Sequence, residues 1–221
     1  MNIGILGSGD VGRRLGDGLI ALGHKVKIGT REPGKLDLQQ WINLHGQEKA
    51  TAGTFAEAAS FGDELIFLAT LWDGAPNAIK LANVKNFTGK IVIDVTNPLD
   101  FSKGMPPRLV VGHTDSAGET VQRLLPESKI VKALNTVGNL QMVNPDFQGG
   151  PPTMFVCGND KDAKKTVAAS ILTPFGWETI DIGGIEGSRL LEPLAMLWIT
   201  YYFRGLLIIL EQIPETMLLS Y

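Results

Sequence analysis

Short β-rich runs alternate with helical patterns along the first two thirds of the chain. Residues 2–6 form an apolar run that ends at a glycine, and the apolar residues from Val11 to Leu22 then recur at helical spacing. Further β-rich runs cover residues 25–28, 64–69, 90–95 and 129–134. Strands that alternate with helices predict a parallel sheet covered on both faces, so we expect an α/β fold of the Rossmann type with a doubly wound sheet.

The last third of the chain has a different pattern. Two more strands are predicted at residues 153–157 and 177–182, joined by a helix that Asn159 would cap. A strongly helical tail follows from Ile185, with an interruption at Pro193. Glycines and prolines at 149–152 form the clearest linker. We therefore expect a dinucleotide-binding portion, residues 1–148, and a small, mostly helical C-terminal portion, residues 149–221, which helps to close the active site. The pattern leaves open whether the last two strands join the main sheet.

The helical tail carries more apolar surface than a small domain readily buries. That surface predicts either a homodimer interface or ordinary packing within the chain. Its members are Leu194, Leu197, Tyr201 and residues 207–210. The segment 194–210 is the one that could pass for a membrane span, but Arg204 lies near its middle, so we expect no membrane contact.

Composition narrows the functional classes. Of the 221 residues, 44% are hydrophobic and 19% are charged, a balance typical of a globular protein with a real core. The net charge of −3 gives no general attraction to nucleic acid or to anionic lipid. The single cysteine excludes an internal disulfide, and the first residues lack the features of a signal peptide, so we expect a cytoplasmic protein.

The first strand leads directly into the sequence Gly7-Ser8-Gly9-Asp10-Val11-Gly12, a complete G-x-G-x-x-G. In a strand–turn–helix context this spacing predicts a dinucleotide site. Gly7 permits the tight turn, Gly9 lets the backbone approach the pyrophosphate, and Gly12 lets the helix pack against the strand. The free N–H groups of the helix start then face the phosphate charge. The alternative is a glycine-rich turn without a ligand.

The end of the second strand distinguishes between nucleotides. An NAD site normally places an acidic residue there to bind the ribose 2′-hydroxyl. Here Thr30 and Arg31 occupy that position, and Lys35 follows one turn later. A hydroxyl and two cations suit a 2′-phosphate, so we predict NADP. Glu32 is the one residue that argues for NAD, and a solvated loop is the other interpretation of these charges.

Three more strands end in small, hydroxyl or amide residues. The carboxyl ends of parallel strands meet at one edge of the sheet, where the ligand crevice of this fold lies. We therefore expect these loops to line the ribose and the nicotinamide. The predicted residues are Ala69, Thr70, Trp72, Asn97, Pro98, Asn135, Thr136, Val137 and Asn139. Asn97-Pro98 could instead be an ordinary turn, and Trp72 a core aromatic residue.

No catalytic acid or base and no metal-binding spacing is recognisable. The histidines His24, His45 and His113 have no obvious orienting partner, and Cys157 within a strand is expected to be a buried hydrophobic residue. Lys132 is either a proton donor or a surface residue. Hydride transfer to a redox cofactor requires orientation more than acid catalysis, whereas reduction of a carbonyl or an imine usually requires a proton donor. We therefore assign no catalytic side chain.

The motifs recur in the order of one known family. The glycine turn, Gly29-Thr30-Arg31, Asp94-Val95-Thr96-Asn97-Pro98-Leu99, Lys132-Ala133-Leu134-Asn135-Thr136 and Arg189-Leu190-Leu191-Glu192-Pro193-Leu194 follow one another. Over essentially the whole chain this resembles the coenzyme F420-dependent NADP oxidoreductases and their bacterial relatives, which transfer hydride between NADP(H) and a 5-deazaflavin.

The resemblance implies which residues contact the cofactors. NADP contacts are implied at Ser8 to Val11, Thr30, Arg31 and Lys35, and the nicotinamide and deazaflavin are implied near Trp72 and residues 135–139. Archaeal members carry a histidine where this chain has Asn135, and related domains of membrane metalloreductases use a flavin. NADPH-dependent reduction of a flavin, carbonyl or imine compound, and a non-enzymatic NADP-sensing protein, therefore stay open as alternatives.

Overall fold

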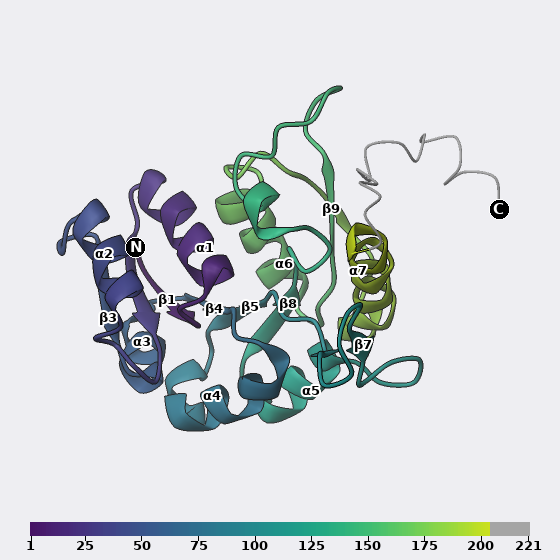
Figure 1. The fold of residues 1–221 in the computed structure, drawn as a ribbon, viewed down its shortest axis with the longest axis horizontal. Helices are drawn as coiled ribbons and strands as arrows, with labels where there is room; N and C mark the ends of the chain where they lie inside the picture. The colour runs from purple at the N-terminus through teal and green to yellow at the C-terminus, as the bar shows by residue number, and fades with distance from the viewer. Residues whose placement is uncertain (204–221) are drawn as a thin grey trace.

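The computed structural model describes residues 1–203, and these contain a six-stranded parallel sheet with helices on both faces (Figure 1). The strand order is β3-β2-β1-β4-β5-β8, so the predicted doubly wound fold is confirmed. The strands are β1 (Asn2–Leu6), β2 (Lys25–Gly29), β3 (Ala50–Gly53), β4 (Leu65–Leu68), β5 (Ile91–Asp94) and β8 (Lys129–Lys132). The chain reverses its direction of winding between β1 and β4, which places a ligand crevice at the carboxyl ends of these strands.

Alternating side chains of the strands form two apolar layers. On one face, Ile3 and Ile5 of β1 pack with Leu15 and Leu19 of the first helix, and on the other face Leu6 packs with the opposite helices. Helices α1 (Asp10–Ala21), α2 (Leu36–His45) and α6 (Lys161–Val167) cover the first face. Helices α3 (Phe55–Phe61), α4 (Ala75–Ala82) and α5 (Ala117–Leu124) cover the second (Figure 1). Successive side chains of each strand point to opposite faces of the sheet, so the apolar residues of the strands bind a layer of helices on each face.

Strand β3 was not predicted. It consists of alanine, threonine and glycine, and lacks the branched apolar residues by which strands are recognised. It forms because β2 offers a free edge, with Val26 aligned to Ala50 and Gly29 aligned to Gly53. Thr54 then caps α3 through a capping box with Glu57.

The two strands predicted near the C-terminus are present but form a sheet of their own. Strands β9 (Thr153–Val156) and β10 (Glu178–Asp181) pair in parallel, and α6 and the π-helix η4 (Ala168–Leu172) connect them. An antiparallel bridge between Lys132 and Cys157 links β9 to the end of β8. The predicted boundary between residues 148 and 149 lies in the loop before β9, although apolar side chains of both portions share one core.

Two local predictions in this portion are wrong. Asp160 rather than Asn159 caps α6, because its side chain accepts a hydrogen bond from the Ala163 N–H, whereas Asn159 accepts one from the Ile185 N–H. Helix α7 (Ser188–Phe203) continues through Pro193 without an interruption. Its buried residues Leu191, Ala195 and Ile199 lie on one face on both sides of the proline, so packing keeps the two parts in one helix.

The remaining elements are short. They are the 3-10 turns η1 (Trp72–Gly74), η2 (Val84–Phe87), η3 (Asn139–Gln141) and η5 (Ile185–Gly187), and the hairpin of β6 (Leu99–Asp100) with β7 (Arg108–Leu109). None of the described helices is long and apolar enough to cross a membrane. Part of the apolar tail surface, residues 207–210, lies outside the described residues.

Candidate functional site

The glycine turn has the geometry that its sequence predicts. Gly7 has a φ of +124°, and a Cβ atom at Gly7 or at Gly12 would collide with backbone atoms of the turn or of the loop after β4. A Cβ at Gly9 would meet no atom within 4 Å, so this position faces open space. No side chain caps the start of α1, and its first N–H groups are therefore free to bind an anion.

The predicted 2′-phosphate residues lie beside this turn. The Ser8 hydroxyl donates a hydrogen bond of 3.1 Å to the Thr30 hydroxyl, which joins the glycine turn to the end of β2. Arg31 and Lys35 are exposed, and Lys35 Nζ lies 3.3 Å from the carboxylate of Asp37. Within the described part of the chain, Arg31 has no ion-pair partner, so its guanidinium is available to a ligand.

Sequence reasoning missed a charged network under the same turn. Arg13 donates to the Ser8 carbonyl at 3.2 Å and forms ion pairs with Asp10 and Asp37. The hydrogen bond from Arg13 holds the pKa of Asp37 below its ordinary value. The i,i+3 spacing of Asp10 and Arg13 was a visible signal for the first pair, whereas nothing in the sequence indicates the second.

Three predicted residues end neighbouring strands of the sheet. Thr70 follows β4, Asn97 follows β5 and Asn135 follows β8. The Asn97 amide donates to the Asn135 carbonyl at 2.7 Å, and the Asn135 amide donates to Asn97 Oδ1 at 2.9 Å. Thr70 Oγ1 and Asn135 Oδ1 are buried and have no hydrogen-bond partner in the described part of the chain. Unpartnered buried polar atoms are rare in proteins, so these two atoms at the ends of neighbouring strands are candidates for contact with a ligand.

The other predicted residues lie around these three. Ala69, Pro98 and Thr136 are buried, and Val137 and Asn139 are half-buried. Trp72 is half-buried and packs against the core beneath α4, so the core interpretation of this residue has support. The indole of Trp198 on α7 lies 3.9 Å from the place that a Cβ of Gly138 would occupy, so α7 borders the loop after β8.

Lys132 is neither a surface residue nor a free proton donor. It is completely buried, and its Nζ lies 2.9 Å from the carboxylate of Asp94, 3.0 Å from that of Glu192 and 2.6 Å from the carbonyl oxygen of Thr96. Burial opposes its charge, but the two carboxylates outweigh burial and raise the pKa of Lys132. All three protons of the ammonium group are therefore used within the protein.

Glu192 attaches α7 to the rest of the molecule. Its carboxylate accepts hydrogen bonds of 2.9 and 3.0 Å from the N–H groups of Ala117 and Gly118 at the start of α5, besides the ion pair with Lys132. Burial raises the pKa of Glu192 against the opposing effect of Lys132. Three of the sequence motifs that carry the family resemblance, those that contain Asp94, Lys132 and Glu192, thus meet in one buried network. Two members of this network could have been suspected from the sequence, because Asp94 and Lys132 are charged residues at the ends of apolar strands.

The structure identifies no free acid or base at the strand ends among His24, His45 and Cys157. His45 has an orienting partner, contrary to expectation, because its Nε2 lies 2.9 Å from Asp17 Oδ1, but this pair lies between α2 and α1 near the opposite edge of the sheet. His24 is half-buried beside the N-terminus, and His113 is exposed. Cys157 is buried as predicted, and burial raises the pKa of its thiol to about 11. Among the described residues no group of side chains could hold a metal ion.

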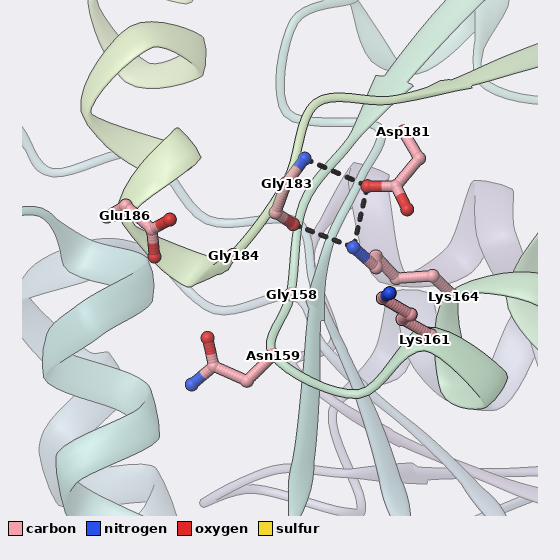
Figure 2. A pocket seen from close by; sticks show the side chains of 8 residues that line it. All are labelled: Gly158, Asn159, Lys161, Lys164, Asp181, Gly183, Gly184 and Glu186. Carbon is pink, nitrogen blue, oxygen red and sulfur yellow. Dashed lines mark hydrogen bonds and ion pairs between the residues drawn. The ribbon is translucent and has the colours of Figure 1, made fainter.

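A hollow of about 400 Å³ lies elsewhere, at the carboxyl ends of β9 and β10 (Figure 2). It contains none of the predicted site residues. Lys164 in its wall pairs with Asp181 at 2.6 Å and donates to the Gly183 carbonyl at 2.7 Å (Figure 2). Its most buried charge is therefore neutralised within the protein, in contrast to the unpartnered atoms of the crevice.

Known proteins resemble the chain over most of its length. Residues 2–98 match the family model described as NADP oxidoreductase, coenzyme F420-dependent. The F420-dependent NADP reductase of Methanocaldococcus jannaschii is 31% identical over 206 residues, which cover 90% of this chain and 91% of that protein. A crystal structure from Arthrobacter sp. FB24, named as a candidate F420-dependent NADP reductase, is 40% identical with a TM-score of 0.86, and the match covers 93% of this chain and 96% of that one.

A second group of relatives is longer. The metalloreductase STEAP3 of Rattus norvegicus is 30% identical over 202 residues, which cover 88% of this chain but only 36% of that protein. The chain thus spans about a third of the metalloreductase, and nearly all of the archaeal reductase. By its sequence and its fold, the chain belongs to the coenzyme F420-dependent NADP oxidoreductase family.

Proposed function

We propose that the protein binds NADP(H) on the glycine turn and transfers hydride directly between the nicotinamide and a deazaflavin, coenzyme F420, stacked on it. When bound, NADPH supplies a hydride from C4, and the deazaflavin accepts it at C5, spreads the negative charge into its pyrimidine ring and takes a proton from solvent. The main support is that Asp94 and Lys132, the buried titratable groups at the ends of β5 and β8, are paired with each other. Neither member of this pair is a free proton donor, which favours a site that orients two rings over one that supplies a proton.

The adenosine half of the nucleotide would lie between the glycine turn and the end of β2. The uncapped N–H groups of α1 suit the pyrophosphate, and the exposed cations of Arg31 and Lys35 suit a 2′-phosphate. The nicotinamide half would lie over the ends of β4, β5 and β8. There Thr70 Oγ1 and Asn135 Oδ1 are available to its ribose and carboxamide groups.

Nucleotide preference tests the first half of this proposal. Titrating the protein with NADPH and with NADH, followed by nucleotide fluorescence, should show tighter binding of NADPH. Arg31→Ala should weaken NADPH binding by about 1.5–3 kcal/mol, the contribution of one charged hydrogen bond, and should leave NADH nearly unchanged. Lys25→Ala, which removes an exposed cation at the opposite end of β2, is the matched control. Equal affinities for the two nucleotides, or unchanged NADPH binding in Arg31→Ala, would exclude NADP specificity at this site.

The acceptor is tested by mixing the protein with NADPH and oxidised coenzyme F420 and following the deazaflavin absorbance. Loss of that absorbance, with stereospecific transfer of deuterium from labelled NADPH to C5, supports direct hydride transfer. If the absorbance persists while a flavin or a carbonyl or imine compound oxidises NADPH rapidly, the protein is a reductase of that other substrate. Tight NADPH binding without turnover of any acceptor would favour the NADP-sensing alternative.

A further inference from the structure

The turn after β8 contains a residue in a strained backbone conformation. Leu134 is buried and has a φ of +61°, a left-handed conformation that residues with side chains rarely adopt. Such a position persists only where the surrounding contacts determine it. The next residue is Asn135, so the conformation of Leu134 sets the direction in which the Asn135 amide points.

The start of α7 supplies two of those contacts. Asn135 Nδ2 donates to the Leu191 carbonyl at 3.2 Å, and Glu192, the next residue of α7, accepts from Lys132 Nζ at 3.0 Å. With the bond to Asn97, both amide hydrogens of Asn135 are therefore used within the protein. Its Oδ1 is left buried and without a partner in the part of the chain that the structure describes. The free atom of this amide is thus an acceptor, so a ligand group that satisfies it must donate a hydrogen bond.

We propose that Glu192 and Lys132 are positioning residues of the nucleotide site, which fix the start of α7 against the Leu134–Asn135 turn so that Asn135 Oδ1 accepts a hydrogen bond from the nicotinamide carboxamide. The identity of the ligand rests on the proposed function. The nicotinamide half of NADP can donate through its carboxamide NH₂ and its ribose hydroxyls, and we assign Asn135 Oδ1 to the carboxamide because that group is attached to the reacting ring. Neither Glu192 nor Lys132 contacts the nucleotide in this arrangement, and both act through Asn135.

Of the two proposed positioning residues, Glu192 is the better one to substitute in a test, because its removal leaves the buried charges balanced. The network contains one cation and two carboxylates, so Glu192→Gln leaves Lys132 and Asp94 as a balanced pair within hydrogen-bond distance. The substitution weakens the attachment of α7 to the turn without leaving the lysine unpaired. Glu119→Gln is the matched control, because Glu119 pairs with Arg189 and also joins α5 to α7, but it contacts neither β8 nor the turn.

The experiment compares two ligands in the full-length protein. NADPH contains the nicotinamide, whereas 2′,5′-ADP contains the adenosine half and the 2′-phosphate alone. We expect Glu192→Gln to weaken NADPH binding roughly 3- to 10-fold, the effect of one misaligned hydrogen bond, and to reduce the fluorescence change of the bound nicotinamide. Binding of 2′,5′-ADP should be unchanged, and Glu119→Gln should behave as the unaltered protein with both ligands.

A merely structural role would give a different result. If Glu192→Gln weakens both ligands equally, or weakens neither while the unaltered protein binds both, the positioning role is wrong and the NADP site itself stands. If the unaltered protein binds neither ligand, the proposed function fails as well. Should thermal melting show that Glu192→Gln does not fold, Asp94→Asn disturbs the same network from β5, and the same loss of NADPH binding without loss of 2′,5′-ADP is expected.

Discussion

Replacing Lys132 with methionine would remove the only cation of the buried network. Methionine has a similar length and flexibility, so the main change is the loss of charge and of three hydrogen bonds. Lys132 and Asp94 are completely buried and Glu192 is 1% exposed. In the variant, water therefore cannot replace the ammonium group, and two carboxylates and the Thr96 carbonyl lose their shared donor.

Removing one partner of a buried ion pair costs about 3–5 kcal/mol, because the other charge stays buried without compensation. In a protein of this size, 1 kcal/mol corresponds to roughly 2–4 °C in the melting temperature. Lys132→Met should therefore melt roughly 6–20 °C below the unaltered protein at pH 7.5, as measured by circular dichroism. Lys129→Met on the same strand is the control, because Lys129 is exposed and pairs with Asp160 at 3.4 Å. That variant should differ by at most about 1 kcal/mol.

The pH dependence of the stability of Lys132→Met distinguishes a loss of charge pairing from a loss of packing. Burial already raises the pKa of Glu192 against the opposing effect of Lys132, and without the cation that opposing effect is lost, so the folded-state pKa of Glu192 rises further above that of the unfolded chain. A carboxyl group whose pKa is raised in the folded state contributes stability below its unfolded pKa and loses it as the pH rises through its folded pKa. The deficit of Lys132→Met should therefore be smaller at pH 5 than at pH 7.5. An equal deficit at both pH values, or one below about 1 kcal/mol, would refute the buried-charge explanation.

Two further predictions concern the cysteine and the exposed part of α7. Because burial raises the pKa of Cys157 to about 11, the folded protein should react very slowly with iodoacetamide at pH 8 and rapidly after unfolding in guanidinium; rapid reaction of the folded protein would contradict its burial. Leu197 is 65% exposed on α7, and Leu190, one heptad earlier, is 69% exposed, which supports the predicted homodimer. Light scattering should show a dimer for the unaltered protein and a monomer for Leu197→Glu, and an unaltered protein that is a monomer at micromolar concentration would exclude this interface.

The elements of the fold could be predicted where a pattern of neighbouring residues in the sequence indicates them. Strands β1, β4, β5 and β8 are runs of branched apolar residues, and α1 follows from the spacing of its leucines. Strand β3 could not be found in this way, because Ala50 to Gly53 have little preference for a strand and pair only because β2 presents an edge. The continuation of α7 through Pro193 is likewise a tertiary effect, since the buried face of the helix outweighs the local effect of one proline.

The same distinction applies to the site. The glycine turn is a local motif, and its spacing was enough to predict where a backbone must approach a ligand. The network of Asp94, Lys132 and Glu192 joins residues that lie 38 and 60 positions apart, and only the folded chain brings them together. From the sequence, Lys132 was expected to be a proton donor or a surface residue, because no acidic residue lies next to it in the chain. The acidic partners of this buried lysine are distant in sequence and can be identified only from the folded structure.

This arrangement changes how the last family motif should be understood. Arg189 and Glu192 lie in the first turns of α7, close enough to the crevice to suggest contact with a substrate. Instead, Arg189 pairs with Glu119 and so attaches α7 to α5, whereas Glu192 pairs with Lys132 of β8 and with the start of α5 and so attaches α7 to the sheet as well. Asp94, Lys132 and Glu192 are thus paired with one another, and among the described residues at the ends of β4 and β8 the buried atoms without a partner include a hydroxyl and an amide oxygen, Thr70 Oγ1 and Asn135 Oδ1. A site built in this way controls distance and orientation, the two quantities on which direct transfer of hydride between two rings depends.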